Sequence, residues 1–489
     1  MSHAPRTLGR VTRSSLRLTI STDDRLATAI AAIRAELDLP DGFPASVEAE
    51  AQRVVEASPL PEADLTDVPF MTIDPESSTD LDQAVHIERL GDGYLVRYAI
   101  ADVPAFVEPL GEIDDEARRR GQTFYAPDGR IPLHPTIISE NAASLLPDRV
   151  RGAFVWRFSL DADGAVLSTE LSRARIRSVR QLSYVEAQSE IDSSAGPDAA
   201  TADETVMLLA EVGPARRVLE RKRGGASLSR PEQIVFSSEG HYALERRSSL
   251  PVEEWNAQIS LLTGMEAARI MIAGRVGILR TMPAPDPDTI ERFRLRTEAL
   301  GHPWPASMPY GEYLASLDSN DPLQLAITHA AGSLFRGAGY TAFDGEVPEQ
   351  VSQAAVGAPY AHTTAPLRRL VDRFTLVVCE ALCAGEAPPE WARDALASLP
   401  KIMAASDSRA SQLDNRSIAA VEAAILSDRI GEVFEASVIS AKQDRGVVQL
   451  LDPAVDAECA GSLTPGQRVR VRLVEAVIET GRVLFELVA

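Results

Sequence analysis

The sequence predicts an α+β protein of several domains, the last of which is a small β-barrel. Its 489 residues are too many for one hydrophobic core, so two to four domains are expected. Strand and helix patterns are mixed over residues 66–185, and helical periodicity dominates residues 202–430. From about residue 432, short alternating strands are separated by Gly, Asp and Pro, as in a barrel. The predicted domains are a short N-terminal helical region (1–65), a central α+β domain (66–430) and the C-terminal barrel (432–489).

Local patterns place the individual elements in order. In the N-terminal region, apolar residues at helical spacing predict helices over 23–37 and around 47–55. The next stretch is expected to hold strands near 94–103, 152–160 and 165–178 and a short helix near 113–121. The clearest later helices are predicted at 205–223, 251–273, 322–335, 366–383 and 401–427. The barrel strands are predicted at 433–441, 446–452, 467–478 and 481–488. The Ser/Ala/Asp-rich stretch 189–204 is expected to be a flexible surface insertion.

The overall charge limits the kind of surface that the protein presents. The chain has 49 basic and 71 acidic residues and a net charge of −22, which argues against a surface that coats nucleic acid indiscriminately. A local basic channel is still compatible with this charge. Arginines are concentrated in RARIRSVR (173–180) and in ARRVLERKRGG (215–225), which are either solvated faces or contacts to a polyanion.

The cellular location is predicted from cysteine use and from the lack of export signals. The three cysteines form neither a disulfide framework nor a metal quartet, and Cys379 and Cys383 lie at helical spacing in an apolar run, as core thiols do. No apolar run is long enough for a membrane span, and residues 1–15 lack the apolar core of a signal peptide. We therefore expect a cytoplasmic protein without a membrane partner.

An acidic loop is the first candidate site. Asp74, Asp80 and Asp82 lie in MTIDPESSTDLDQA (71–84), where Pro, Ser and Thr favour an irregular loop that can turn three carboxylates onto one point. Such aspartates are often only solvated turn formers. A calcium loop of the EF-hand type is excluded, because its sixth position is Thr79 instead of Gly and its twelfth is Val85 instead of Glu. A few carboxylates with room for water and phosphate oxygens favour Mg²⁺ and phosphodiester or phosphoryl chemistry.

Further motifs follow the acidic loop in a fixed order. They are IADVPAFV (100–107), DDEARRRGQTFYAPDGRIPLHPTIISENAASLLP (114–147), IRSVRQLSY (176–184) and YAHTTAPLRRLVDRF (360–374). Together with the loop they resemble the catalytic domain of the ribonuclease II (RNB) family over residues 66–430, and the tail resembles that family's OB-type RNA-binding domain. The resemblance implies a mixed sheet surrounded by helices. It also implies a magnesium-dependent enzyme that hydrolyses single-stranded RNA from the 3′ end and releases nucleoside 5′-monophosphates.

The resemblance assigns roles to individual residues. It implies that Asp74, Asp80 and Asp82 hold Mg²⁺, that Asp82 is the most critical of them, and that Arg368 clamps the scissile phosphate, with Arg369 beside it. Tyr125 is expected to stack on a base and Tyr184 to contact the terminal nucleotides. Either Glu253 or Glu254 is expected to contact the terminal ribose, and Glu254 is the residue that we assign to the site. His362 is interpreted as a structural histidine.

The sequence departs from the family pattern at four places. Gln83 stands where the family has a second adjacent aspartate, so one negative charge is lost, and either a second magnesium ion would be held less tightly or Gln83 would serve through a bound water. The stacking clamp offers only Leu228, and Ser260 replaces the usual Asn. Residues 1–65 are too few for the paired cold-shock barrels of the typical enzyme.

The function that the resemblance implies is that of a monomeric magnesium-dependent 3′→5′ exoribonuclease. The alternatives are a catalytically weak RNA-binding protein and a phosphatase of small esters.

Overall fold

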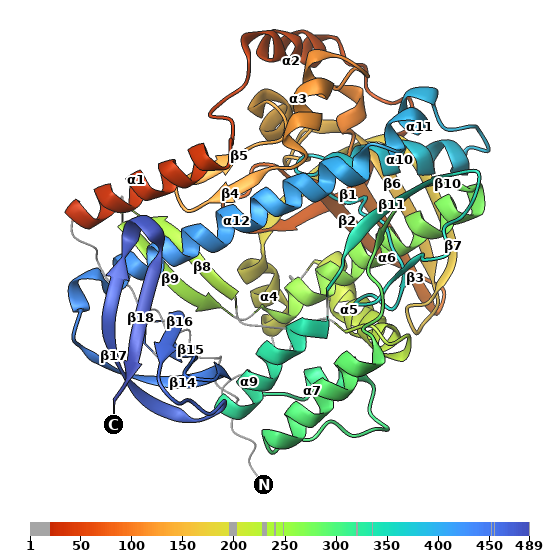
Figure 1. The fold of residues 1–489 in the computed structure, drawn as a ribbon. Coiled ribbons are helices and arrows are strands. Elements are labelled where there is room, and N and C mark those ends of the chain that lie inside the picture. Colours follow the sequence, from red (N-terminus) through yellow and green to blue (C-terminus); the bar gives the residue numbers. More distant parts are fainter. Residues whose placement is uncertain are drawn as a thin grey trace.

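The computed structural model describes most of the chain. The described residues are 20–194, 203–226, 232–238, 241–247, 249–318, 321–334, 336–450, 452–453 and 455–488. Leu228 and residues 195–202 of the predicted insertion lie outside them. In the described residues the predicted α+β class is confirmed, with helices packed around two separate β-barrels (Figure 1).

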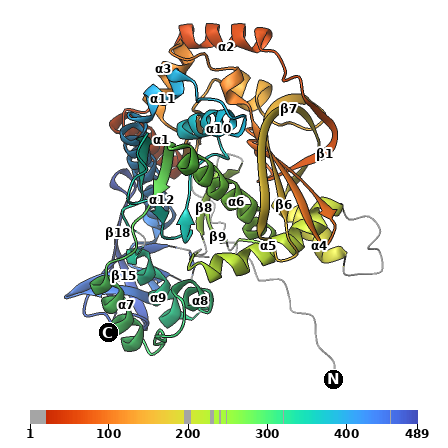
Figure 2. The same cartoon turned by 90° about the vertical axis from the view of Figure 1, so that its right-hand side faces the viewer.

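The first barrel lies toward one side of the molecule, at the right in Figure 2. It is closed and contains β1 (Asp64–Asp74), β2 (Gln83–Leu90), β3 (Gly93–Ala101), β6 (Val150–Leu160) and β7 (Val166–Ser183). β1 and β7 are parallel and the other neighbours are antiparallel, so the expected mixed sheet exists but curls into a barrel. β3 is buried at eight of its nine positions, which explains why YLVRYAIA reads as an almost continuous apolar run.

Helices cover this barrel and complete the main core. α4 (Tyr184–Ser193), α5 (Glu204–Lys222), α6 (Pro251–Gly274) and α10 (Leu370–Cys383) contribute side chains to the same hydrophobic cluster as β3 and β6. α2 (Ala45–Ala57) and α3 (Glu112–Arg120) lie together at one end of the molecule (Figure 2). α10 begins at Leu370, four residues later than predicted. Residues 366–368 form a hydrogen-bonded turn instead, and Arg369 is extended and pairs with Gln122 as a β-bridge.

The second barrel shares a buried cluster with two helices from other parts of the chain. It consists of β14 (Val433–Lys442), β15 (Arg445–Leu450), β16 (Asp456–Ala460), β17 (Arg468–Val477) and β18 (Arg482–Leu487). Leu26 and Ile30 of α1 (Ile20–Glu36) share a buried cluster with α12 (Leu399–Leu426) and this barrel. The sequence did not predict β16, whose DAECA pattern is short and contains two acidic residues.

Several short strand pairs interrupt the region that was predicted as helical. They are β8 (Glu232–Ser238) with β9 (His241–Arg247), β10 (Val276–Thr281) with β11 (Gly339–Asp344), and β12 (Ser352–Gln353) with β13 (Ala358–Pro359). The strands of the β10–β11 pair are separated by almost 60 residues of chain, so no local pattern could reveal their pairing. Between them lie α7 (Pro287–Ala299), α8 (Tyr310–Ala315) and α9 (Pro322–Ala331), which share a small aromatic core around Phe293.

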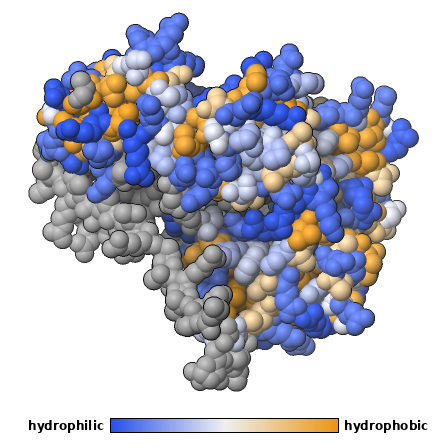
Figure 3. All heavy atoms as spheres, turned by 90° about the horizontal axis from the view of Figure 1, so that it is seen from below, coloured by the Kyte–Doolittle hydropathy of each residue, from blue (hydrophilic) through white to orange (hydrophobic). Residues whose placement is uncertain are grey.

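The remaining elements are short or peripheral. β4 (Phe124–Ala126) and β5 (Gly129–Ile131) form a hairpin, and α11 (Glu390–Leu396) packs beside α10. Among the described residues, none of the helices has the length and apolar character that a bilayer crossing requires. On the face drawn in Figure 3, hydrophobic residues lie in separate patches among hydrophilic ones.

Candidate active site

The predicted carboxylates lie around one cavity. Asp74 is the last residue of β1, Asp82 directly precedes β2, and Asp80 lies in the loop between the two strands. The cavity has a volume of about 630 Å³. Its lining includes the three aspartates, Gln83, Tyr125, Tyr184, Arg130 and Arg368. Six of the residues predicted for the site are therefore brought together from four separate parts of the chain.

Backbone and side-chain hydrogen bonds fix the shape of the acidic loop. The Ser144 hydroxyl donates to the Thr79 carbonyl (2.8 Å) and accepts from the Leu81 N–H (2.9 Å). The Gln181 amide, from β7, donates to the Ser78 carbonyl (3.0 Å). These contacts come from distant segments and hold the loop in one conformation, so the loop is not a mobile set of turns. The solvated-turn interpretation of the aspartates is wrong for Asp82, which is only 3% exposed.

Asp82 links the acidic loop to the arginine segment. Its Oδ1 accepts the Leu367 N–H at 2.7 Å, and its Oδ2 lies 3.5 Å from Nε of Arg368. Burial nevertheless holds the pKa of Asp82 well above its usual range, because Arg368 and the Leu367 N–H offset only part of the desolvation cost. The carboxylate is thus in contact with Arg368 and still lacks full charge compensation.

Asp74 and Asp80 have different surroundings. Burial raises the pKa of Asp74 to about 6, with Arg368 opposing the shift and Asp80 adding to it. Asp80 has one carboxylate oxygen paired with Arg130 of β5, and the same guanidinium also contacts Glu140 at 2.9 Å. Arg130 was not predicted as a site residue. It lies in the same motif as Tyr125 (114–147), and this is the sequence signal that could have indicated it.

The donor set suits a magnesium ion, although the three aspartates are not arranged as a finished metal cage. Within the described residues, no group of three or more His, Cys, Asp or Glu side chains is positioned to hold a metal ion. Carboxylate oxygens are the ligands that Mg²⁺ prefers. The raised pKa values of Asp74 and Asp82 indicate negative charge that the surrounding protein leaves undercompensated, and a divalent cation would relieve it.

Arg368 lines the cavity, whereas Arg369 lies outside its described lining. The Arg368 side chain is 51% exposed and lines the cavity. Arg369 is held by Asp372, with Nε to Oδ2 at 2.6 Å and Nη2 to Oδ1 at 2.9 Å. This pairing raises the pKa of Arg369 despite the cost of its burial. The predicted contact of Arg369 with RNA stays a prediction, and the observed contact is structural.

Two tyrosines reach the cavity from different elements. Tyr125 extends from β4 and is 51% exposed. Tyr184 is the first residue of α4, where Ser183 and Glu186 form a capping box that fixes the start of the helix. Burial raises the pKa of each phenol to about 12, so both are neutral at physiological pH. They present two aromatic faces to whatever occupies the cavity.

The remaining predicted residues lie outside the described lining of this cavity. Glu254 pairs with Arg217 of α5, and Glu253 pairs with Arg247 (2.6 Å) and accepts the Leu250 N–H at the start of α6 (3.0 Å). Their contact with a terminal ribose therefore stays a prediction. His362 is a packing residue, as expected: its ring lies against Tyr340 and Tyr360, and Nδ1 is 2.7 Å from the Tyr340 hydroxyl.

Comparison with known proteins identifies the family. The RNB domain model matches residues 62–383, and the model of the RNase II-type exonuclease C-terminal S1 domain matches residues 432–488. The chain belongs to the RNB family. Thus the resemblance that the acidic loop and its downstream motifs indicated is confirmed.

Individual relatives agree with this assignment. The chain is 29% identical over 327 residues to exosome complex exonuclease RRP44 homolog A of Arabidopsis thaliana, covering 64% of this chain and 34% of the relative. It is 27% identical over 357 residues to ribonuclease R of Escherichia coli, covering 68% and 42%. The chain therefore spans well under half the length of these relatives. The apo form of Mycoplasma genitalium RNase R has the same fold, with a TM-score of 0.83 at 20% identity over 95% of this chain and 78% of that one.

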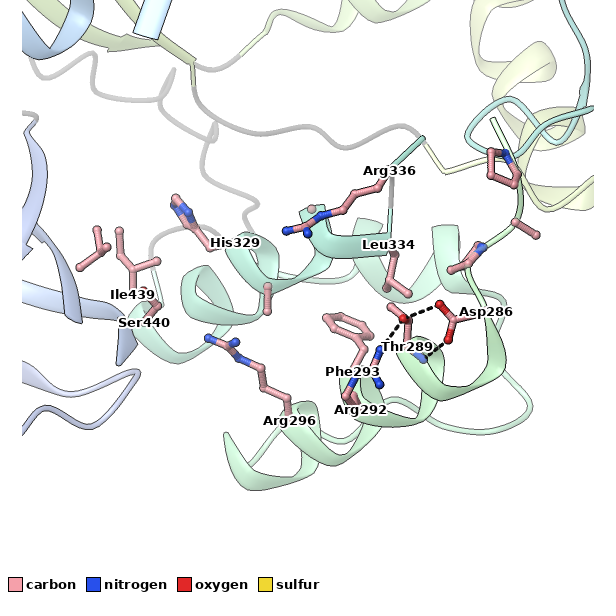
Figure 4. A pocket seen from close by; sticks show the side chains of 16 residues that line it. Asp286, Thr289, Arg292, Phe293, Arg296, His329, Leu334, Arg336, Ile439 and Ser440 are labelled. Atoms are coloured by element: carbon pink, nitrogen blue, oxygen red, sulfur yellow. Dashed lines mark hydrogen bonds between the residues drawn. The ribbon is translucent and has the colours of Figure 1, made fainter. Parts of the chain in front are cut away.

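A second cavity differs from the RNB active-site cavity in its charge. It has a volume of about 890 Å³ and lies between α7, α9 and strands β14 and β15 of the C-terminal barrel (Figure 4). Its described lining contains Arg292, Arg296, Arg336 and His329, and the single carboxylate of that lining, Asp286, is engaged in capping α7 through Thr289. Burial lowers the pKa of Arg296. Sequence analysis missed this cavity, because the RFRLR run of α7 (292–296) was not singled out and Arg336 lies far from it along the chain.

The two basic clusters that the sequence did indicate are largely engaged within the protein. Salt bridges or backbone contacts occupy most of their arginines: Arg173 with Asp102, Arg175 with Asp64, Arg180 with Glu190, Arg216 with the Gly164 carbonyl, Arg217 with Glu254 and Arg223 with the Val356 carbonyl. These arginines stabilise the RNB fold, and the proposed basic channel receives no support from them.

Proposed function

We propose that this protein is a magnesium-dependent hydrolytic 3′→5′ exoribonuclease that degrades single-stranded RNA to nucleoside 5′-monophosphates. The observation that carries the proposal is the meeting of Asp74, Asp80, Asp82, Arg368 and two tyrosines in one cavity of an RNB-family chain. The related RRP44 and ribonuclease R proteins are named as ribonucleases or exonucleases. Mycoplasma genitalium RNase R has been solved with ribose-methylated single-stranded RNA.

The chemistry follows from the residues that line the cavity. Asp74, Asp80 and Asp82 would hold Mg²⁺, which polarises the phosphate and lowers the pKa of the attacking water when it is bound. Arg368 donates to the non-bridging oxygens of the scissile phosphate, where negative charge increases in the transition state. Asp82 keeps the guanidinium at the mouth of the cavity through the 3.5 Å contact at Nε. The hydrogen bond from the Leu367 N–H fixes the backbone beside it.

The tyrosines supply binding that does not depend on sequence. An exposed phenol ring such as that of Tyr125 stacks on any base, since every base has a π-face. Tyr184 projects from the fixed start of α4 and contacts the nucleotide nearest the carboxylates. In this proposal the free 3′ end of the RNA binds beside Tyr184 and the carboxylates, so degradation proceeds from 3′ to 5′.

The cationic cavity between α7, α9 and the C-terminal barrel supports an RNA substrate. Arg292, Arg296 and Arg336 gather there in a chain with a net charge of −22, where a random surface would be acidic. Phosphate groups of a polynucleotide would compensate these cations, so we assign this cavity to the RNA backbone upstream of the active site. A small phosphate ester would have no use for a second anion-binding cavity.

Hydrolysis of labelled RNA tests the proposal. Purified protein is incubated with 5′-labelled single-stranded RNA with and without Mg²⁺, and released mononucleotides are measured. We expect progressive shortening from the 3′ end that requires the metal and falls by at least about 100-fold in Asp82→Asn. Asp163→Asn, in the exposed turn between β6 and β7, is the matched control and should retain full activity. A wild-type protein that releases no mononucleotide, or an Asp82→Asn variant as active as the wild type, would contradict the proposal.

One observation favours a second candidate. Yeast Ssd1, described as a pseudonuclease, shares the fold with a TM-score of 0.71 at 17% identity over 94% of this chain, so the fold alone does not secure catalysis. Gln83 removes one carboxylate from the acidic cluster. An RNA-binding protein with little turnover would bind the same labelled RNA with unchanged affinity in wild type and Asp82→Asn and would release no product from either.

A further inference from the structure

Gln83 is the residue at which this chain departs from the acidic cluster of its family, and both ends of its side chain are hydrogen-bonded. Nε2 of Gln83 donates to the Thr364 carbonyl at 2.6 Å. Its Oε1 accepts the Tyr98 hydroxyl at 2.8 Å. Tyr98 is 1% exposed on β3, and burial raises its pKa well above the ordinary value, so its hydroxyl stays protonated and donates. Both ends of the Gln83 carboxamide are therefore occupied by the protein itself.

The Thr364 carbonyl belongs to the segment that presents Arg368. Three other contacts hold the same segment: Leu367 N–H to Asp82, Ala365 N–H to Asp372 at 2.7 Å, and the Thr364 hydroxyl with the Ser260 hydroxyl at 2.8 Å. Gln83 and Asp82 are adjacent, and they bind this segment three residues apart. Together they connect the start of β2 to residues 364–367.

We infer that Gln83 is a positioning residue that fixes the Arg368 segment against β2, and that it is not a weakened metal ligand. This inference rests on the proposed function and deepens it, because it explains how the side-chain amide of Gln83 fixes the position of Arg368. A carboxamide is required because Gln83 must donate at one end and accept at the other. An ionised carboxylate of the same length would place a second acceptor 2.6 Å from the Thr364 carbonyl and would repel it. An aspartate is one methylene shorter and would lose both partners.

The inference reverses the simplest expectation for this site. If Gln83 were only a missing carboxylate, Gln83→Asp would restore the family cluster and raise activity. The observed contacts lead us to expect that it lowers kcat about 10- to 100-fold, since a small displacement of a clamping group costs about that much. Gln83→Glu keeps the length and adds the charge, and Gln83→Leu removes both polar atoms and is, like aspartate, one methylene shorter. Both should reduce kcat similarly, with KM within about threefold of the wild type, because Arg368 acts in the transition state.

A double-mutant cycle identifies the residue through which Gln83 acts. If Gln83 works by placing Arg368, Gln83→Leu in an Arg368→Ala background should cost less than about threefold in addition. Fully multiplicative losses would overturn the inference. Tyr98→Phe is the matched control: it removes one bond to Gln83 and leaves the bond to Thr364, so a loss of at most about fivefold is expected.

Two measurements do not depend on catalysis. Titration calorimetry with Mg²⁺ should give Gln83→Leu an affinity within about threefold of the wild type, whereas loss of a true ligand or its supporting contact costs about 10- to 100-fold. Hydrogen exchange should accelerate at the backbone amides of residues 364–369 in Gln83→Glu and accelerate clearly less in Tyr98→Phe, which keeps the bond to Thr364. Weakened metal binding in Gln83→Leu, unchanged exchange in Gln83→Glu, or a rise in kcat in Gln83→Asp would each overturn the inference.

These readouts also separate this inference from the proposed function. A wild-type protein that does not degrade RNA removes the proposed function, and the exchange and calorimetry results still decide whether Gln83 holds the segment. Thermal unfolding of each variant is recorded in parallel. Gln83→Glu is the variant least expected to impair folding, because it conserves side-chain volume.

Discussion

His134 shows how a single buried group couples stability to pH. It is 1% exposed, and neither ring nitrogen has a hydrogen-bond partner of normal geometry within the described part of the chain. Burial lowers its pKa to about 3; the Arg373 charge adds to the shift, and the Pro366 backbone opposes it. In the unfolded chain the pKa is near 6.5, so the unfolded state binds the proton first as the pH falls. His134 therefore leaves the free energy of unfolding unchanged above pH 6.5 and lowers it progressively below that pH.

The resulting prediction concerns the free energy of unfolding between pH 7 and pH 5. His134 should contribute a loss of about 2 kcal/mol over this range, since each pH unit below 6.5 costs up to about 1.4 kcal/mol. The glutamine in His134→Gln does not titrate. Between pH 7 and pH 5 the unfolding free energy of this variant should therefore fall by about 2 kcal/mol less than that of the wild type. Denaturant unfolding at both pH values measures it. His302→Gln, at a partly exposed position, is the control, and equal pH dependence in His134→Gln and wild type would contradict the prediction.

At the scale of one element, the segment 364–369 depends on Asp372 of α10. This carboxylate is fully buried, accepts the Ala365 N–H and binds Arg369 in a bidentate pair. Asp372→Asn leaves the Arg369 charge buried without its counter-ion and should cost about 3–5 kcal/mol of stability. RNA hydrolysis should also fall, because Arg368 is the adjacent residue. Asp344→Asn removes an exposed pair with Arg393 and should cost less than about 1 kcal/mol. Equal unfolding midpoints for the two variants would refute this prediction.

The same segment shows where sequence reasoning succeeds and where it cannot. Asp74, Asp80, Asp82 and Arg368 were predicted because their motifs occur in order along the chain, and the fold brings them to one cavity. The partners of Gln83 were not predictable, since Thr364 lies 281 residues away and its carbonyl carries no residue-type signal. Residues 366–369 were predicted as helix because they precede an apolar helical run, but 366–368 form a turn and the bridge of Arg369 to Gln122 is non-local. Long helices and alternating strands are local patterns, so they were predicted well.

At the scale of the whole molecule, the C-terminal barrel and the α7–α9 helices together create the cationic cavity. The cavity is lined by Arg296 from α7, by Arg336 after α9, and by Ile439 and Ser440 from β14 (Figure 4). Neither element provides it alone, so its arginines are useful only when the barrel is docked. The barrel is also fixed from the other side by α1, whose Arg25 forms a bidentate pair with Glu479. A strand of RNA that reaches both cavities would contact both domains of the protein.

This arrangement predicts that RNA affinity becomes weaker and less sensitive to salt when the cavity carries less positive charge. In Arg296→Gln/Arg336→Gln, binding of single-stranded RNA long enough to reach the cavity should weaken. The slope of log Kd against log salt concentration should decrease by about 0.7 for each phosphate that the variant no longer neutralises. Hydrolysis of a very short RNA should be unaffected, because the active-site cavity is unchanged. Arg393→Gln, an exposed arginine paired with Asp344, is the matched control. Fluorescence anisotropy from low to moderate salt measures the slopes, and parallel lines for wild type and double variant would exclude the cavity from the RNA path.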